Sequence, residues 1–359
     1  MEPVAIVPGR WLADLVAGVF GTLGFSPGAS AAIAEDLVDA DLRGISSHGV
    51  MLTPIYADRV QRGSVSRLET FDVVVDRDAV AVLDAGHGLG QLSSRVAMDM
   101  ATERALAHGV GAVTVRRAHH FGAAGRHALR AAERGCIGIA CSNTTALMPA
   151  PGGASRVLGN NPVAMAVPTA SGPPLLLDMA LSAVALNRIR MAERAGTPIP
   201  DTWATDSGGI PTTDPAAAIA GMLLPAGGHK GFGLALMVEV LTSVLSGGAW
   251  SVHSLYRDPD LHNDCSHFFM ALDVAHFMDA DQFQAQTAQL GRLIRESPPH
   301  PGVEAVHAPG DGQWRRRLEQ LERGVAVSPT ALVELQECAR RLGVDASLPQ
   351  GEEGGDAQA

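Results

Sequence analysis

The chain has 359 residues, of which 46% are hydrophobic and 18% are charged, and its formal net charge at pH 7 is −11. This length predicts a large buried core divided between two or three domains, and the negative charge argues against a protein that binds a nucleic-acid backbone. Four scattered cysteines do not form a disulfide framework, and the first residues lack the pattern of a signal peptide, so we expect a cytoplasmic protein.

The predicted elements fall into three zones along the chain. The first zone is helical, because Leu12, Leu15, Val16 and Phe20 recur at helical spacing and a second such pattern ends at Gly44. In the middle zone, strand-like and helical segments alternate. The expected strands cover residues 71–85, 111–118, 136–143, 161–169, 174–180 and 267–274, and the expected helices cover 91–109, 123–135 and 230–245.

The last zone is helical again from Asp279 to about Leu342, followed by a polar segment, residues 346–359, that predicts a disordered tail. The pattern favours a mixed α/β core (residues 71–279) flanked by a helical domain from both chain ends (residues 1–70 and 280–345). Residues 193–215, rich in proline and glycine, predict a long ordered loop. The longest apolar run, residues 231–248, is interrupted by Glu239 and is too short to span a bilayer comfortably, so we expect a buried helix and no membrane partner.

The stretch DLRGISSHGV, residues 41–50, presents serine and histidine directly after a helix stop. Histidine is the side chain best suited to exchange a proton near neutral pH, and the hydroxyl of Ser47 can orient the imidazole of His48. The alternative is that Ser47 caps the next helix and His48 is an ordinary loop or core residue.

The glycines in DAGHGLGQL, residues 84–92, resemble a phosphate-binding turn between a strand and a helix. The dinucleotide fingerprint G-x-G-x-x-G fails, because Gln91 stands three residues after Gly88, and no acidic residue follows a second strand at the expected distance. We therefore interpret this segment as a structural turn.

Two later segments have the character of anion sites. In RRAHHFGAAGRHA, His119 and His120 precede Gly122–Gly125, where backbone N–H groups at a helix start are covered by almost no side chains. The alternative is that these small residues serve only close packing. In PAGGHKGFG, Lys230 lies at a helix start, where a cation opposes the helix dipole unless a ligand anion is bound.

Polar side chains also accompany three strands. Asp178 ends an apolar strand, where its carboxylate can hold a ribose or nicotinamide group, and short polar residues fill SNTTALMPAPGG and LGNNPVAMAVPT. The segment HNDCSH brings together His262, Cys265 and His267 as possible zinc ligands, but the paired spacing of structural zinc sites is absent, so we expect no metal.

Taken together, six motifs resemble the type-2 malate/L-lactate dehydrogenase family of NAD(P)-dependent oxidoreductases. They are GxxSHG, HHFGAAG, LGNNPxA, DMA, the block ending GGHKGFGLALMVEVL and a late PGD. The resemblance runs from about Leu12 to Leu342. The family includes lactate, malate, sulfolactate, ureidoglycolate and diketogulonate dehydrogenases and piperideine-2-carboxylate reductases. It implies an α/β, non-Rossmann fold in which a largely antiparallel or mixed sheet binds the cofactor, a helical domain joins it, and the protein is a homodimer.

The resemblance also implies residue roles. His48 is expected to donate the proton to the substrate, with Ser47 as its relay partner, and His120 to share the acid–base work. Asn160 stands at a substrate-contacting position. The expected cofactor contacts are His120, Phe121, Gly122, Ala123, Ala124, Asp178, Met179, Ala180, His229, Lys230, Gly231 and Gly310.

The main departure from the family is Leu52, which stands where an arginine usually clamps the substrate carboxylate. Leucine cannot replace a bidentate clamp. Leu181 and Leu186 are further departures near the cofactor segments. The sequence therefore predicts a specialised imine or ketone reductase of a biosynthetic pathway, with altered substrate recognition.

Two alternatives stay open. One is an ordinary 2-hydroxy acid dehydrogenase whose substrate carboxylate is held by Arg43, Arg188 or main-chain donors, and the other is a cofactor-binding protein that has lost turnover. NAD and NADP are both possible, with NADPH the expectation for a reductase. We expect the terminal helices to form part of the homodimer interface, because each has an apolar face to cover.

Overall fold

The computed structural model describes residues 4–254 and 258–349. They form two compact units, one comprising the chain up to Ala57 and from Arg315 onward (unit 1) and the other comprising Asp58–Trp314 (unit 2). Both chain ends lie in unit 1, and the boundaries fall near residues 57 and 314, where the sequence suggested 70 and 279. The difference arises because helix α9 (Ala280–Arg295) bonds to the earlier part of unit 2, for example where Ala170 N–H donates to the carbonyl of Gln284.

Unit 1 consists of helices joined by one pair of strands. Helices α1 (Gly9–Thr22) and α2 (Pro27–Leu42) pack together, and two single 3₁₀ turns, η1 (Ser46–His48) and η2 (Val50–Leu52), follow. The unit is completed by the start of α3 (Thr53–Arg62), the end of α10 (Asp311–Arg323) and α11 (Pro329–Arg341). Helices α2 and α11 begin where the sequence provides a serine cap followed by proline.

The two strands of unit 1 were not predicted. Strand β1 (Ala5–Val7) pairs antiparallel with β11 (Val325–Val327), so the two ends of the chain are hydrogen-bonded to each other. Strands of three residues are too short to show a period in the sequence. The uniform helical zone predicted beyond Asp279 is therefore wrong, since β11 and residues 296–310 interrupt it.

The predicted disordered tail is also wrong in its first residues. Ala346 is 2% exposed and accepts a hydrogen bond from Gln336, and the carbonyl of Ser347 accepts one from the indole N–H of Trp11. These contacts fix the segment although it carries little apolar content. Residues 350–359 of the predicted tail lie outside the described residues.

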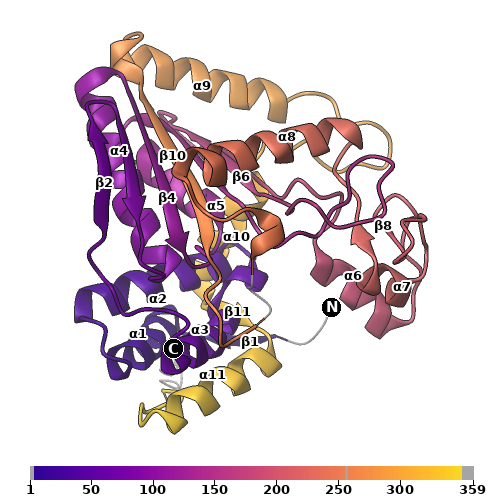
Figure 1. The fold of residues 1–359 in the computed structure, drawn as a ribbon. Helices are drawn as coiled ribbons and strands as arrows, with labels where there is room; N and C mark the ends of the chain where they lie inside the picture. The colour runs from indigo at the N-terminus through magenta and orange to yellow at the C-terminus, as the bar shows by residue number, and fades with distance from the viewer. Residues whose placement is uncertain (1–3, 255–257, 350–359) are drawn as a thin grey trace, which may run out of the picture. The chain divides into compact units, whose positions relative to one another are not determined.

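Unit 2 is built on a seven-stranded sheet (Figure 1). The strands are β2 (Asp72–Arg77), β3 (Val80–Asp84), β4 (Val110–Ala118), β10 (Cys265–Asp273), β5 (Cys136–Ser142), β6 (Val163–Val167) and β7 (Leu175–Met179), in that spatial order. Only β3 and β4 run parallel, and every other neighbouring pair is antiparallel. The predicted α/β, largely antiparallel, non-Rossmann fold is confirmed. The predicted strand at residues 71–85 is a hairpin that turns at Asp78, whose φ is +38°.

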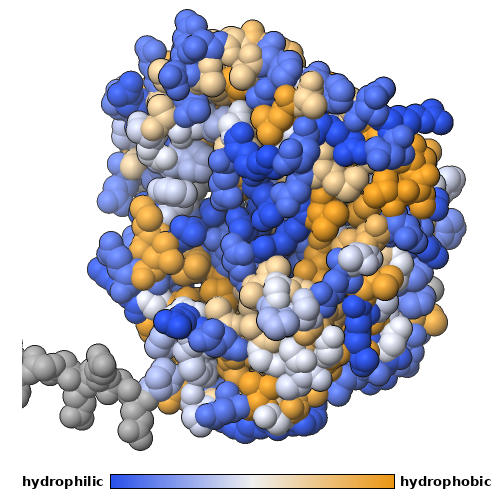
Figure 2. All heavy atoms as spheres, turned by 90° about the vertical axis from the view of Figure 1, so that its left-hand side faces the viewer, coloured by the Kyte–Doolittle hydropathy of each residue, from blue (hydrophilic) through white to orange (hydrophobic). Residues whose placement is uncertain are grey.

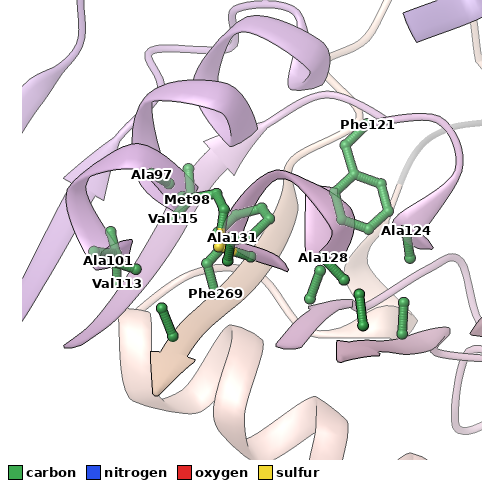
Figure 3. Packing of buried hydrophobic residues seen from close by; sticks show 14 of the residues in the cluster. Ala97, Met98, Ala101, Val113, Val115, Phe121, Ala124, Ala128, Ala131 and Phe269 are labelled. Carbon is green, nitrogen blue, oxygen red and sulfur yellow. The ribbon is translucent and has the colours of Figure 1, made fainter. Parts of the chain in front are cut away.

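The central strand β10 separates two hydrophobic layers. Phe269 and Ala271 belong to a buried cluster with α4 (Gly90–His108) and α5 (Ala124–Ala132), which Figure 3 shows from close by. The alternate residues Phe268 and Met270 pack with a second cluster that includes Ala235 and Val238 of α8 (His229–Glu239). Because successive side chains of a strand point to opposite faces, α4 and α5 cover one face of the sheet and α8 the other.

The remaining elements of unit 2 are short. Helices α6 (Leu186–Ala195) and α7 (Pro215–Ala220) flank the predicted loop. Strand β8 (Ala204–Thr205) of this loop pairs with β9 (Met222–Leu223), which follows α7. A five-residue π-helical segment, η3 (Val240–Val244), continues α8, and single 3₁₀ turns form η4 (Ser251–His253) and η5 (Val274–His276).

The surface agrees with the composition. Hydrophilic residues cover much of the face in Figure 2, with separate apolar areas between them. The four cysteines are free and buried. Within residues 4–254 and 258–349, none of the helices combines the length and the apolar character that crossing a membrane requires.

One close approach links the core to a predicted site segment. Gly90, the first residue of α4, lies so near the backbone of His119 and His120 that a Cβ there would overlap both carbonyl oxygens. We expect Gly90→Ala to lower the free energy of unfolding by about 1–3 kcal/mol, the usual cost of overpacking. Urea denaturation measures this change. Gly28→Ala is the control, since nothing lies within 4 Å of its added methyl group, and an equal loss in both variants would contradict the packing argument.

Candidate functional site

The predicted catalytic pair lies in unit 1. The hydroxyl of Ser47 is 2.9 Å from Nδ1 of His48, and both residues belong to the 3₁₀ turn η1. The structure shows no side-chain cap from Ser47 to a following helix, so the capping alternative is wrong. Burial lowers the pKa of His48 below its ordinary value, because desolvation penalises the imidazolium. At pH 7 the imidazole is therefore mostly neutral and is oriented by Ser47.

The segment that carries His48 is fixed by Asp41, a residue that sequence reasoning missed as a site component. One carboxylate oxygen of Asp41 accepts a hydrogen bond of 2.7 Å from the N–H of Val50, and a Cβ on Gly49 would overlap the same carboxylate. Burial raises the pKa of Asp41 to about 7, although the bond from Val50 opposes the rise. The signal in the sequence was an acid at the start of DLRGISSHGV, seven residues before His48.

In unit 1 the two candidate substrate contacts, Arg43 and Leu52, do not expose a positive charge. Arg43 is 6% exposed and is bound to Asp39 at 2.6 Å, and the second oxygen of Asp39 accepts from Arg317 at 2.9 Å. This ion cluster occupies the Nε of Arg43. Leu52 is buried in η2 at 7% exposure.

In unit 2, three predicted cofactor segments are joined by hydrogen bonds. The first contact links the start of α5 to β7, since Gly125 N–H donates to the carboxylate of Asp178 at 3.0 Å. The second links β7 to the turn at residues 308–311, where Leu176 N–H donates to the carbonyl of Pro309. Gly310 has a φ of +96° and lies against the backbone of Leu176. The segments that contain Gly122–Ala124, Asp178–Ala180 and Gly310 therefore meet at β7.

The chain beyond β7 connects this region to Asn160 and to α8. Leu181 N–H donates to the carbonyl of Asn160 at 2.7 Å, and Ala226 N–H donates to the carbonyl of Leu181 at 2.9 Å. Three residues later α8 begins with His229 and Lys230, both exposed. The structure thus brings the predicted unit 2 residues into one neighbourhood, although they are spread over almost 200 positions of the sequence.

The side chains of this neighbourhood differ in character. His120 is half-buried, whereas Phe121 is 2% exposed and stacks on His267 at a centroid distance of 4.5 Å. Phe121 is therefore a core residue that holds the turn from beneath. The Asp178 carboxylate uses one N–H donor at the start of α5, a site that we expected to be open to a ligand anion. Lys230 and the exposed glycines Gly227 and Gly228 leave the start of α8 accessible.

Arg188 is held by an aromatic side chain. Its guanidinium stacks over Trp203 at 5.1 Å from the ring centroid, an arrangement typical of a cation–π contact. Trp203 lines a pocket of about 510 Å³ together with Ala183, Thr202 and residues 224–228. This pocket adjoins the glycines that precede α8.

The zinc alternative finds no support in the geometry. His262 contacts the carbonyl of Ser64, Cys265 contacts Asn263, and His267 lies by Ser94. Across the part of the chain that the structure describes, no three histidine, cysteine or acidic residues are grouped so that they could hold a metal ion. The glycine segment at residues 84–92 is the predicted strand-to-helix turn between β3 and α4.

Comparison with known proteins identifies the family. The model of the malate/L-lactate dehydrogenase family matches residues 7–336. The chain belongs to this family. It is 38% identical over 346 residues to a malate dehydrogenase of Pyrococcus abyssi, covering 94% of this chain and 95% of the relative. As a member of the malate/L-lactate dehydrogenase family, it is an NAD(P)-dependent oxidoreductase.

Two further relatives differ in their cofactor. An Escherichia coli ureidoglycolate dehydrogenase (NAD(+)) is 34% identical, covering 83% of this chain and 85% of the relative. A Chromohalobacter salexigens (2R)-3-sulfolactate dehydrogenase (NADP(+)) is 36% identical, with coverages of 84% and 88%. Among solved structures, the sulfolactate dehydrogenase of Methanocaldococcus jannaschii matches with a TM-score of 0.90 and 32% identity over 95% of this chain and 98% of that chain.

The lowered pKa of His48 predicts a specific pH dependence for this family member. If His48 is the acid–base residue, its neutral imidazole accepts a proton in the oxidation direction, and we expect kcat/KM to be flat above pH 6.5, the ordinary pKa, and to fall as pH drops through the lowered pKa. In the reduction direction the imidazolium is needed, so the rate falls as pH rises. We expect His48→Ala to lower kcat by about 10²–10⁴-fold.

Steady-state kinetics in both directions between pH 5 and 9 checks this prediction. Ser47→Ala is the matched variant, because it keeps the imidazole and removes its orienting hydroxyl. An oxidation profile with its midpoint above pH 7 in the wild type, or an unchanged kcat in His48→Ala, would remove the assignment.

Proposed function

We propose that this protein transfers a hydride between a nicotinamide cofactor and a carbon doubly bonded to oxygen or nitrogen in a small substrate. The observation that carries the proposal is the Ser47–His48 hydrogen bond of 2.9 Å. When the hydride reaches the carbon, negative charge or basicity develops on the attached oxygen or nitrogen, and a proton from His48 neutralises it. His120 shares this acid–base work.

The residues of unit 2 fit a dinucleotide. Exposed Lys230 lies at the start of α8, where the helix dipole and a cation together favour an anion such as pyrophosphate. His229 and Gly231 belong to the same turn. The Asp178 carboxylate, beside Met179 and Ala180, can accept a hydrogen bond from a ribose hydroxyl. The backbone of Gly122–Ala124 and Gly310 provides close approach without side chains, and the cofactor when bound supplies the hydride.

The substrate is proposed to be an imine or a ketone that carries an uncharged or hydrocarbon group where relatives hold a carboxylate. Leu52 offers no charge, Arg43 is bound to Asp39, and Arg188 is stacked on Trp203. A desolvated carboxylate needs a cation or several donors. This interpretation favours a specialised reductase of a biosynthetic pathway in the cytoplasm, with NADPH as reductant.

The second candidate is an ordinary 2-hydroxy acid dehydrogenase. It is favoured by the 38% identity to a protein named malate dehydrogenase over nearly the whole chain. In that case Asn160 and main-chain N–H groups hold the carboxylate, or the outer nitrogens of Arg43 do so while its Nε stays on Asp39.

A substrate panel distinguishes the candidates. Oxidation of NADH and NADPH is followed with pyruvate, oxaloacetate, cyclic imine carboxylates and uncharged imines and ketones, in wild type and Leu52→Arg. We expect 2-oxo acids to be poor substrates that Leu52→Arg improves, because arginine restores a bidentate partner.

Two results would contradict the proposal. Wild-type kcat/KM above about 10⁴ M⁻¹s⁻¹, an ordinary enzyme value, on pyruvate or a cyclic imine carboxylate would favour the dehydrogenase. Tight binding of NADPH without turnover of any panel member would favour a cofactor-binding protein.

Lys230 is predicted to contribute directly to cofactor binding. Lys230→Ala should weaken binding of NADH or NADPH by about 1.5–3 kcal/mol, the range for a hydrogen bond to a charged group. Calorimetry measures the dissociation constants. Arg190→Ala, on exposed α6, is the control for loss of a surface cation, and equal affinity of Lys230→Ala and wild type would refute the role.

We also propose that the protein is a homodimer. We expected the terminal helices at the interface, but an apolar stripe in unit 2 is a stronger candidate for part of it. Leu234, Met237, Leu241 and Val244 of α8 and η3 are 37–59% exposed and recur at spacings of three, four and three residues. This spacing makes a seam that a second copy of the same helix can cover across a two-fold axis.

Light scattering tests the dimer and its interface. We expect twice the chain mass of 37.3 kDa for the wild type at micromolar concentration, and the single-chain mass for the double variant Leu234→Asp, Met237→Asp. Met191→Asp, at an exposed apolar position of α6, should stay dimeric. A monomeric wild type would exclude the dimer, and a dimeric double variant would exclude this interface.

A further inference from the structure

The carboxylate of Glu239 is buried in unit 2 and is bound by neutral groups of other chain segments. Its side chain is 6% exposed. It accepts hydrogen bonds from the side-chain amide of Asn161 at 2.7 Å, from both the N–H and the hydroxyl of Ser251, and from the hydroxyl of Ser243 at 3.3 Å. A carboxylate is the side chain best able to accept from four donors at once.

The helix is irregular at this point. Glu239 is the last residue of α8, and the following residues form the π-helical segment η3. The extra residue of a π turn costs stability and is frequently found at functional sites. Here Ser243 faces Glu239 and also accepts a hydrogen bond from Asn143 at 2.8 Å, so the irregular turn contributes to the same network.

The side-chain hydrogen bonds of Asn161 also fix the backbone next to its neighbour Asn160. Its side-chain oxygen accepts the N–H of Thr144 at 3.0 Å, while its nitrogen also donates to the carbonyl of Ala235. The φ of Asn161 is +20°, and a Cβ on the preceding Gly159 would overlap Thr144 and Asn161. The turn is therefore tight, strained and held by side chains rather than by a sheet.

Asn160 is left with one orientation. Its side-chain oxygen accepts the hydroxyl of Thr144 at 2.8 Å, and its carbonyl accepts Leu181 N–H at 2.7 Å. Within the described residues, no group accepts a hydrogen bond from the Asn160 side-chain nitrogen. That N–H₂ group is thus the donor that the network presents.

We propose that Glu239 is a positioning residue for substrate recognition: through Asn161 it fixes the turn that presents the side-chain amide of Asn160 to the carbonyl or carboxyl oxygen of the substrate. The inference rests on the proposed function, in which Asn160 contacts the substrate. Glu239 is the acidic residue of the apolar helix α8. The proposal gives it a role in addition to core packing, because the helix that carries Lys230 in its first turn also supports the substrate turn at its last residue.

The test uses Glu239→Gln in the full-length protein. Glutamine keeps the size but places an N–H₂ group against donors, so the turn loses part of its support. We expect KM for the best substrate of the panel to rise at least tenfold, while the dissociation constant of NADH or NADPH changes less than twofold. In an Asn160→Ala background, Glu239→Gln should change KM less than twofold, because the residue acts through Asn160.

Thr242→Val is the matched control. Thr242 is also buried and lies in the same turn, but its hydroxyl donates to the backbone carbonyls of Val238 and, at 3.4 Å, Glu239, rather than to the Glu239 carboxylate or to Asn161. We expect it to leave KM within twofold. If Glu239→Gln does not fold, Ser251→Ala removes one donor to the carboxylate and should raise KM in the same direction by a smaller factor.

Amide hydrogen exchange gives a readout that needs no substrate. Exchange of residues 158–164 should accelerate at least tenfold in Glu239→Gln and not in Thr242→Val. Two results overturn the proposal. One is unchanged amide exchange in Glu239→Gln, and the other is that Glu239→Gln raises KM by the same factor in the Asn160→Ala background as in the wild type. If wild type turns over no substrate, the proposed function fails on its own, and the exchange experiment still decides whether Glu239 fixes the turn.

Discussion

The architecture of unit 2 depends on one strand that must be apolar on both faces. Strand β10 is hydrogen-bonded to β4 on one side and β5 on the other, so it cannot move without breaking two ladders. Its alternating residues Phe268 and Phe269 anchor opposite layers. Because both layers are close-packed against this strand, the ends of the neighbouring strands β4 and β5 are fixed in position, and so are the starts of the segments that follow them. The turn at His119–His120 follows β4, and the polar segment at Asn143–Thr144 follows β5.

The electrostatics of the two units are of different kinds. In unit 1 several charges are buried: Asp39 binds Arg43 and Arg317, and the carboxylate of Asp41 accepts a hydrogen bond from the backbone N–H of Val50. A buried ion cluster of this type costs desolvation energy and contributes orientation more than stability. In unit 2 the charge at Lys230 is exposed, and it sits on a chain with net charge −11. A cation at a helix start raises the local positive potential on a surface whose net charge is negative.

The sequence predicted the elements that repeat over several turns or residues. All the strands expected in the middle zone form, and α4, α5 and α8 lie within one or two residues of their predicted bounds at the start. The short strands β1 and β11 could not be predicted, because their pairing partner lies more than 300 residues away. The same limit applies to the site. The sequence singled out Asp178 as a ligand residue, but its bond to Gly125 depends on the sheet that brings β7 against α5. Glu239 was visible only as an interruption in an apolar run. Ser243 is at helical i,i+4 spacing from it, but no spacing rule connects it to its donors Asn161 and Ser251.

The pairing of β1 with β11 has a consequence for the order in which the chain can fold as it is synthesised. Residues 5–57 emerge first, yet the strand and helices that cover them are encoded after residue 314. Unit 2 is contiguous and can complete its sheet while the ribosome is still translating. Helices α1 and α2 can pack against each other early, but the contacts of α1 with α11 and of α2 with β11 form only after residues beyond 314 have emerged. Such long-range closure slows folding and prolongs exposure of apolar surface. Unit 1 can therefore be completed only after residues 325–327 have been synthesised, whereas unit 2 consists of one continuous stretch of the chain.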